Sequence, residues 1–154
     1  MKQYFILAIA LAIVGSLVLI FWPKLENGEG KVAGPALYIS EKEFDFGIVK
    51  QSGGTVSHDF VVRNIGSEKA TIDSLPGSCA CTSAKSDKKE ILPGESATVT
   101  VIFDPNMHEE PKGKFFKTVE VIGNVVPHPE FKVYAEVNVD LGAKFYKLQT
   151  KDND

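Results

Sequence analysis

The only two cysteines of the chain, Cys79 and Cys81, lie one residue apart in the stretch "PGSCACTSA". They could stay free and pack as small buried hydrophobic side chains. They could also form a disulfide, which an oxidising compartment favours and which would act as an easily reduced redox pair or shape the loop. Alternatively, two thiolates could bind a metal ion such as Cu(I) or Zn²⁺. The sequence leaves all three alternatives open.

The metal alternative has further candidate ligands in the stretch "NMHEE". Met107 and His108 would add a thioether and an imidazole to the thiolates of Cys79 and Cys81, and this ligand set favours copper. The distance between the two loops decides whether one chain can form such a site. If they lie at opposite ends of the domain, the copper site fails, unless a dimer completes it.

Patterns typical of other chemistry are missing from the sequence. No Ser-His-Asp spacing, paired-carboxylate cleft or phosphate-binding glycine loop is present. His58 is expected to be an ordinary strand residue, and Glu109 and Glu110 ordinary loop charges. The net charge is −3, and the basic residues are scattered among acids, which argues against nucleic-acid binding. The sequence therefore predicts no enzyme, no cofactor other than the alternative copper, and no small-molecule substrate.

The elements that would position the cysteines are strands, because hydrophobic residues alternate with polar ones through most of the chain. The inward faces are expected to carry Val56, His58, Phe60 and Val62; Ala97, Val99, Val101 and Phe103; and Phe131, Val133, Ala135, Val137 and Val139. Shorter strands are expected at 37–39, 44–49, 70–75 and 115–122. About seven strands separated by turns predict an all-β, immunoglobulin-like β-sandwich.

The composition divides the chain into four parts. Residues 1–23 are expected to form a signal anchor, 24–35 a flexible Gly-rich linker, 36–142 the immunoglobulin-like β-sandwich, and 143–154 a polar C-terminal tail. The tail is expected to fray.

The signal anchor is expected to be one N-terminal transmembrane helix. Tyr4 to Trp22 is uncharged, and at about 1.5 Å per residue it would span a hydrocarbon layer of roughly 30 Å. Lys2 precedes this segment, and bulky residues stand where a signal peptidase needs small ones, so an uncleaved anchor is favoured over a cleaved peptide. The rest of the chain would then lie outside the cytoplasmic membrane.

Several stretches resemble a bacterial envelope family known as domain of unknown function fifteen seventy-three. The matching motifs are Asp45-Phe46-Gly47, Phe60 with Asn64 and Gly66, Cys79-Ala80-Cys81-Thr82, Pro93-Gly94-Glu95, and Gly113-Lys114 with Asn124. The resemblance covers about residues 37 to 140 and implies an immunoglobulin-like fold related to major-sperm-protein and hydin-type domains. It implies no function, because none is settled for the family.

Two positions depart from the family pattern. Ala80 replaces the usual glycine between the cysteines, which argues against a positive φ there. Val125 replaces the usual aspartate after Asn124, and a longer connection follows it.

The sequence is compatible with two functions. The leading one is a membrane-anchored extracytoplasmic binding or scaffold module of the bacterial cell envelope, without catalysis, whose partner is another envelope protein. The alternative is a copper-binding or thiol-redox protein that uses the Cys79-Ala80-Cys81 loop.

Overall fold

The computed structural model describes residues 32–147. It contains the strands β1 (Leu37–Ile39), β2 (Glu43–Lys50), β3 (Val56–Asn64), β4 (Ala70–Thr71), β5 (Thr82–Ser86), β6 (Glu90–Ile91), β7 (Ser96–Phe103), β8 (Phe115–Glu120) and β9 (Glu130–Asn138). Two short 3₁₀ helices, η1 (Gln51–Gly53) and η2 (Ala143–Phe145), follow β2 and β9. The all-β prediction is confirmed for this part of the chain.

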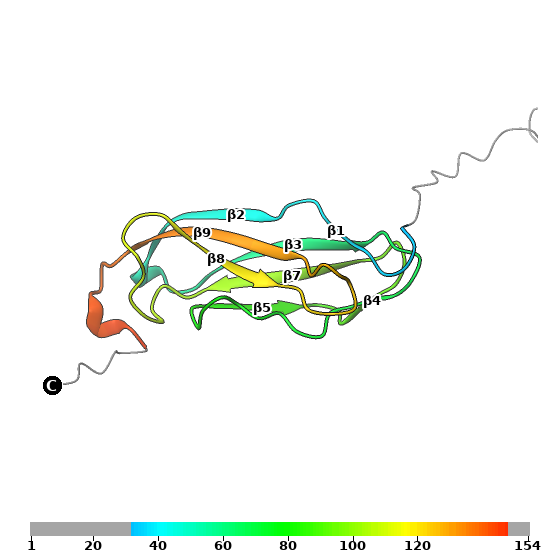
Figure 1. The fold of residues 1–154 in the computed structure, drawn as a ribbon. Coiled ribbons are helices and arrows are strands. Elements are labelled where there is room, and N and C mark those ends of the chain that lie inside the picture. The colour runs from blue at the N-terminus through cyan, green and yellow to red at the C-terminus, as the bar shows by residue number, and fades with distance from the viewer. Residues whose placement is uncertain (1–31, 148–154) are drawn as a thin grey trace, which may run out of the picture. The chain divides into compact units, whose positions relative to one another are not determined.

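The strands form two facing sheets and a small third one. The four-stranded sheet has the order β1-β3-β7-β5, the three-stranded sheet β2-β9-β8, and the last pair is β4-β6. All neighbours are antiparallel except β2 and β9, which run parallel. Figure 1 shows the three-stranded sheet stacked on the four-stranded one.

The core lies between the two larger sheets. Phe60 of β3 and Phe131 of β9 are fully buried, and their rings stack with centroids 4.5 Å apart. The alternating valines of β7 and β9 fill the space around them. Burial of these side chains is the main favourable term in the stability of the sandwich.

Some details of the strand prediction are corrected by the structure. Val139 was expected to face inward, but it follows the end of β9 and is 48% exposed. The strands β5 and β6 were not predicted, because "TSAKS" contains no large apolar residue and β6 is only two residues long. The predicted strand at 70–75 is reduced to β4 and an isolated bridge from Ser74 to Ile122.

Ordered contacts extend beyond the expected borders of the domain. Within the predicted linker, the carbonyls of Val32 and Gly34 accept hydrogen bonds from the Ser67 amide. Within the predicted tail, Tyr146 is buried and the Lys147 amide donates to the Asn106 carbonyl.

The expected transmembrane helix at 1–23 lies outside the described residues. Between Val32 and Lys147, no helix is long and apolar enough to cross a membrane.

Candidate functional site

Two loops meet at one end of the domain, where β5 begins and β7 ends (Figure 1). The first loop carries Cys79 and Cys81, and the second runs from 104 to 114 between β7 and β8. The Asp104 amide donates a 2.8 Å hydrogen bond to the Cys81 carbonyl. This bond follows from the register, because Thr82 of β5 lies opposite Phe103 of β7. The loops that sequence reasoning could not place are therefore neighbours.

Cys79 and Cys81 are joined by a disulfide. Cys81 is buried, whereas Cys79 is half-buried and more accessible. The Thr82 hydroxyl lies 3.5 Å from Sγ of Cys79 and 3.6 Å from Sγ of Cys81. Bonded sulfurs carry no hydrogen, so the hydroxyl is the donor. No described residue other than glycine has a positive φ, so Ala80 has an ordinary backbone conformation.

His108 and Glu110 face the same disulfide. The sulfurs of Cys79 and Cys81, one imidazole nitrogen of His108 and one carboxylate oxygen of Glu110 all lie within 4.8 Å of one another. We call these four residues the cysteine cluster. They combine two sulfur ligands, a nitrogen and an oxygen, which is a set of donors that binds metal ions in many proteins.

Glu110 is the residue of this cluster that sequence reasoning missed. It was expected to be an ordinary loop charge, but its side chain is only 1% exposed. Oε2 lies 2.7 Å from Nζ of Lys117, and Oε1 lies 3.7 Å from Nε2 of His108. Neither oxygen has a hydrogen bond of acceptable geometry, so only the charge of Lys117 balances the buried carboxylate. Nothing in "HEEP" distinguishes Glu110 from Glu109.

The charge of Glu110 is felt by a residue close to the C-terminus. Burial raises the pKa of Tyr146, and the carboxylates of Glu109 and Glu110 raise the same pKa further. Both effects disfavour the charged phenolate form of Tyr146.

Met107 is a partly buried residue that, like Cys79, packs against the small core cluster of Val49, Cys81, Phe103 and Ala135. The loop that carries it is held by the buried Gln51, whose carbonyl accepts a 2.9 Å hydrogen bond from the Asn106 side chain. The structure thus brings Cys79, Cys81 and His108 together with Glu110, whereas Met107 is placed only in the neighbouring core cluster.

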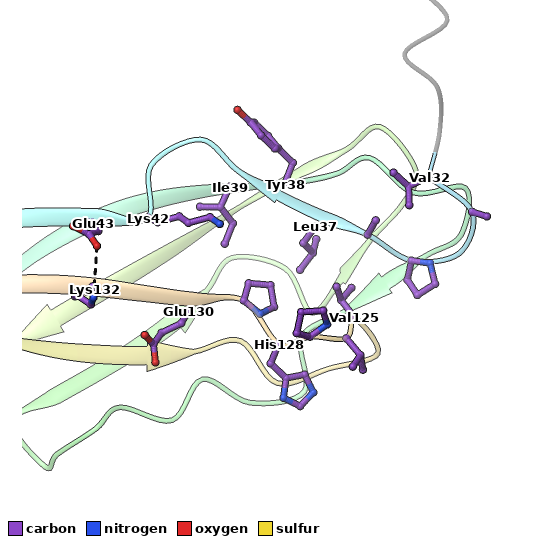
Figure 2. Close-up of a pocket in the computed structure, with 16 residues that line it drawn as sticks. Val32, Leu37, Tyr38, Ile39, Lys42, Glu43, Val125, His128, Glu130 and Lys132 are labelled. Atoms are coloured by element: carbon purple, nitrogen blue, oxygen red, sulfur yellow. Dashed lines mark ion pairs between the residues drawn. The ribbon is translucent and has the colours of Figure 1, made fainter.

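The other two histidines lie away from the cluster. The ring of His58 stacks on that of Phe44 with centroids 3.6 Å apart, and its Nε2 lies 2.9 Å from a carboxylate oxygen of Glu41. His128 lines an open pocket of about 700 Å³ at the opposite end of the domain, together with Val32, Leu37 and Val125. Figure 2 shows this pocket.

The asparagines of the other family motifs form hydrogen bonds with backbone groups. Buried Asn64 donates to the carbonyls of Glu68 and Ile91 and accepts from the Gly66 amide. Asn124 in the same way bridges Lys69 and Thr71. These side chains have no free polar atoms facing a ligand, so their role is structural.

The Asp-Phe-Gly and Gly-Lys motifs also meet each other. Asp45 accepts from the Gly47 amide at an irregularity in β2, and its other oxygen lies 2.6 Å from Nζ of Lys114. This hydrogen bond from Lys114 is the largest cause that lowers the pKa of Asp45. Gly47 has a φ of 66°, which favours glycine there.

Aromatic side chains stand on the outer face of the three-stranded sheet. Phe116 of β8 is 54% exposed, and its ring centroid lies 6.0 Å from that of Tyr134 in β9. Nζ of Lys132 lies 5.0 Å from the Phe116 ring, and Nζ of Lys114 lies 5.4 Å from the Tyr134 ring. We call Phe116, Tyr134, Lys114 and Lys132 the aromatic face.

Comparison with protein families gives one match over most of the domain. The family model described as "Protein of unknown function (DUF1573)" matches residues 37–139, which confirms the resemblance seen in the motifs. No curated protein matches this sequence.

Solved structures with a similar fold come from several kinds of protein. A protein of unknown function from Porphyromonas gingivalis W83 is 21% identical with a TM-score of 0.55, over 75% of this chain and 51% of that one. The Vibrio cholerae VesB protease is 18% identical with a TM-score of 0.50, over 66% of this chain and 31% of that one. The chain thus spans about half the length of the first protein and a third of the second. At such identities the likeness shows the fold alone.

Proposed function

Because this chain belongs to the DUF1573 family, whose function is unknown, its role must be inferred from its own residues, and we propose that it is a membrane-anchored binding or scaffold module. In this proposal the N-terminal segment anchors the chain in the cytoplasmic membrane of a bacterium. The immunoglobulin-like sandwich then lies outside that membrane, where it binds another envelope protein and catalyses no reaction.

The observation that supports binding is the exposed aromatic face. A half-exposed phenylalanine beside a tyrosine costs solvation free energy in an isolated domain, and aromatic residues are enriched at the centres of protein interfaces. Ion pairs of Lys114 with Asp45 and of Lys132 with Glu43 surround the two rings. An apolar centre with a charged rim is the usual arrangement of a protein-binding surface.

Site-specific photo-crosslinking tests this function in the native membrane. A photoreactive residue at position 116 of the full chain should form one discrete crosslinked product with an envelope protein. The same residue at position 85, an exposed site on β5, should not form it. Tyr134→Ala should weaken the product several-fold. Replacing both cysteines with alanine should leave it unchanged.

Two results would contradict the binding module. One is the absence of any product at position 116, and the other is the same set of products at positions 116 and 85.

A second candidate function is thiol-redox or metal chemistry at the other end of the molecule. The observation that favours it is the disulfide between Cys79 and Cys81 with His108 and Glu110 beside it. Crosslinking at the aromatic face does not test redox or metal chemistry at the cysteine cluster. The two candidate functions can therefore be tested separately.

A further inference from the structure

We propose that the cysteine cluster is a redox-gated zinc site: Cys79, Cys81, His108 and Glu110 bind one Zn²⁺ when the disulfide is reduced and release it when the disulfide forms. The proposal rests on the second candidate function, because it assigns a ligand and a means of control to that cluster. It is independent of partner binding at the aromatic face.

The imidazole of His108 is already oriented as a ligand. Its Nδ1 lies 2.9 Å from the carbonyl oxygen of Glu109. A carbonyl only accepts hydrogen bonds, so Nδ1 must carry the hydrogen and donate it. In the neutral ring the lone pair is then on Nε2, the nitrogen that faces Glu110. A backbone carbonyl that holds the ring in this way is typical of metal-binding histidines.

The buried carboxylate of Glu110 is a second, independent observation that favours a metal ion in the cysteine cluster. A buried carboxylate is costly unless its charge is balanced and its oxygens are bonded. Lys117 balances the charge next to Oε2, whereas Oε1 lies 3.7 Å from Nε2 of His108 and has no hydrogen bond. Oε1 is therefore placed to bind a metal ion while Oε2 keeps its ion pair with Lys117.

The positions of the four donors require only small shifts to bind zinc. In a tetrahedral site with Zn–S distances of about 2.3 Å, two sulfurs lie about 3.8 Å apart. Reduction frees the sulfurs to separate to that distance. The imidazole and the carboxylate, now within 4.8 Å of the sulfurs, would approach by about 1 Å.

Counting charges favours Zn²⁺ over Cu⁺. In the disulfide form the cysteine cluster and Lys117 together are neutral, because the charges of Glu110 and Lys117 cancel. With zinc, two thiolates and Glu110 give three negative charges, and Zn²⁺ with Lys117 gives three positive ones, so the buried cluster is again neutral. With Cu⁺ one negative charge would remain unbalanced. The carboxylate oxygen is also a poorer ligand for Cu⁺ than the sulfur of Met107.

The reductant that opens the site is a dithiol of the cell envelope. One of its thiolates attacks Sγ of half-buried Cys79, forms a mixed disulfide and displaces the thiolate of Cys81. Its second thiol then closes its own disulfide and displaces the thiolate of Cys79. Two electrons pass from the dithiol to the pair, and Zn²⁺ then displaces the protons of the two thiols. Oxidation by a disulfide carrier reverses these steps and releases the metal.

Metal titration of the full chain in detergent tests the proposal. The chain is reduced under anaerobic conditions with a phosphine, the phosphine is removed, and Zn²⁺ is added in competition with a chromophoric chelator. The reduced chain should bind one Zn²⁺, and the oxidised chain none. Co²⁺ in place of zinc should give the intense visible bands of a tetrahedral site and a near-ultraviolet band from thiolate ligation.

Variants identify the two ligands that are not cysteines. His108→Ala and Glu110→Gln should each weaken zinc binding roughly tenfold or more. Glu109→Gln and His128→Ala are matched controls and should leave the affinity unchanged, because Glu109 contributes only its backbone carbonyl and His128 lies at the other end. If Glu110→Gln does not fold, the Co²⁺ spectrum of the unmodified chain still tests the site.

Three results would overturn the zinc site. They are no zinc binding by the reduced chain, equal affinity in the His108 and control variants, and binding of Cu⁺ but not of Zn²⁺. Counting the free thiols of the same samples distinguishes a failure of the zinc site from a failure of the second candidate function. A pair that is reduced and reoxidised reversibly but binds no zinc would remain a redox pair.

Discussion

At the scale of single residues, the polar groups of this domain fall into two kinds. Asn64, Asn124 and Asp45 have their polar atoms bonded to backbone or to a partner, and they hold loops in place. Glu110 differs, because it is buried, as Asn64 is, but lacks hydrogen bonds of good geometry. Fully bonded polar residues point to a structural role, whereas a buried carboxylate without good hydrogen bonds needs an explanation of its own.

Asn64→Ala tests the structural role of the first kind. The substitution leaves the carbonyls of Glu68 and Ile91 and the Gly66 amide without their partner. We expect the free energy of unfolding to fall by about 2–3 kcal/mol. Thermal and denaturant unfolding of the full chain measure it, with Asn138→Ala at an exposed position as the control. Equal stability of the two variants would show that Asn64 is not an anchor.

At the scale of elements, the position of the cysteine loop depends on its close approach to β5 and β8. Gly77 forms a bridge with Val119, and the Ser78 amide donates to the Thr118 carbonyl. A Cβ at Gly77 would lie 2.1 Å from the carbonyl oxygen of Thr82, which is part of the backbone and cannot move aside alone. Glycine is therefore needed here for the space it leaves.

Gly77→Ala should displace the cysteine loop and lower the free energy of unfolding by about 1–3 kcal/mol. Gly53→Ala is a matched control, because a Cβ there meets no atom within 4 Å. Denaturant unfolding gives the stability, and the rate at which a dithiol reduces the disulfide reports the displacement. If both variants unfold alike, the contact between Gly77 and Thr82 does not hold the loop.

At the scale of the whole domain, the residues that stabilise the fold are separate from the disulfide at one end of the sandwich. The core of Phe60, Phe131 and the valines lies between the sheets, whereas the disulfide closes a loop of only three residues. Such a short loop loses little entropy on closure. The stability of the fold therefore comes from the core, and the disulfide is free to change its redox state.

Reduction of the disulfide should lower the free energy of unfolding by at most about 1.6 kcal/mol. Denaturant unfolding of the full chain with and without a phosphine reductant measures the difference, and near-ultraviolet circular dichroism checks that packing is kept. A loss of several kcal/mol would make the disulfide a structural element. It would also contradict the zinc site, which needs a folded reduced state.

The sequence determined the class of the fold, because the signal for a half-buried strand is local. Alternating apolar residues place β3, β7 and β9 and their inner faces. Where apolar residues are small or few, as in β5, the same reasoning found no strand. The membrane segment is also a local pattern, and it stays a prediction.

Only the tertiary structure decided the content of the cysteine cluster. The sequence named Cys79, Cys81 and His108 but could not tell whether their loops shared an end of the sandwich. Pairing of β5 with β7 brings the loops together. In the loop after β7, Glu110 is buried and Glu109 is exposed. Two adjacent glutamates are equivalent in a sequence, and they differ only when packing places one beside Lys117 and the disulfide and the other in water.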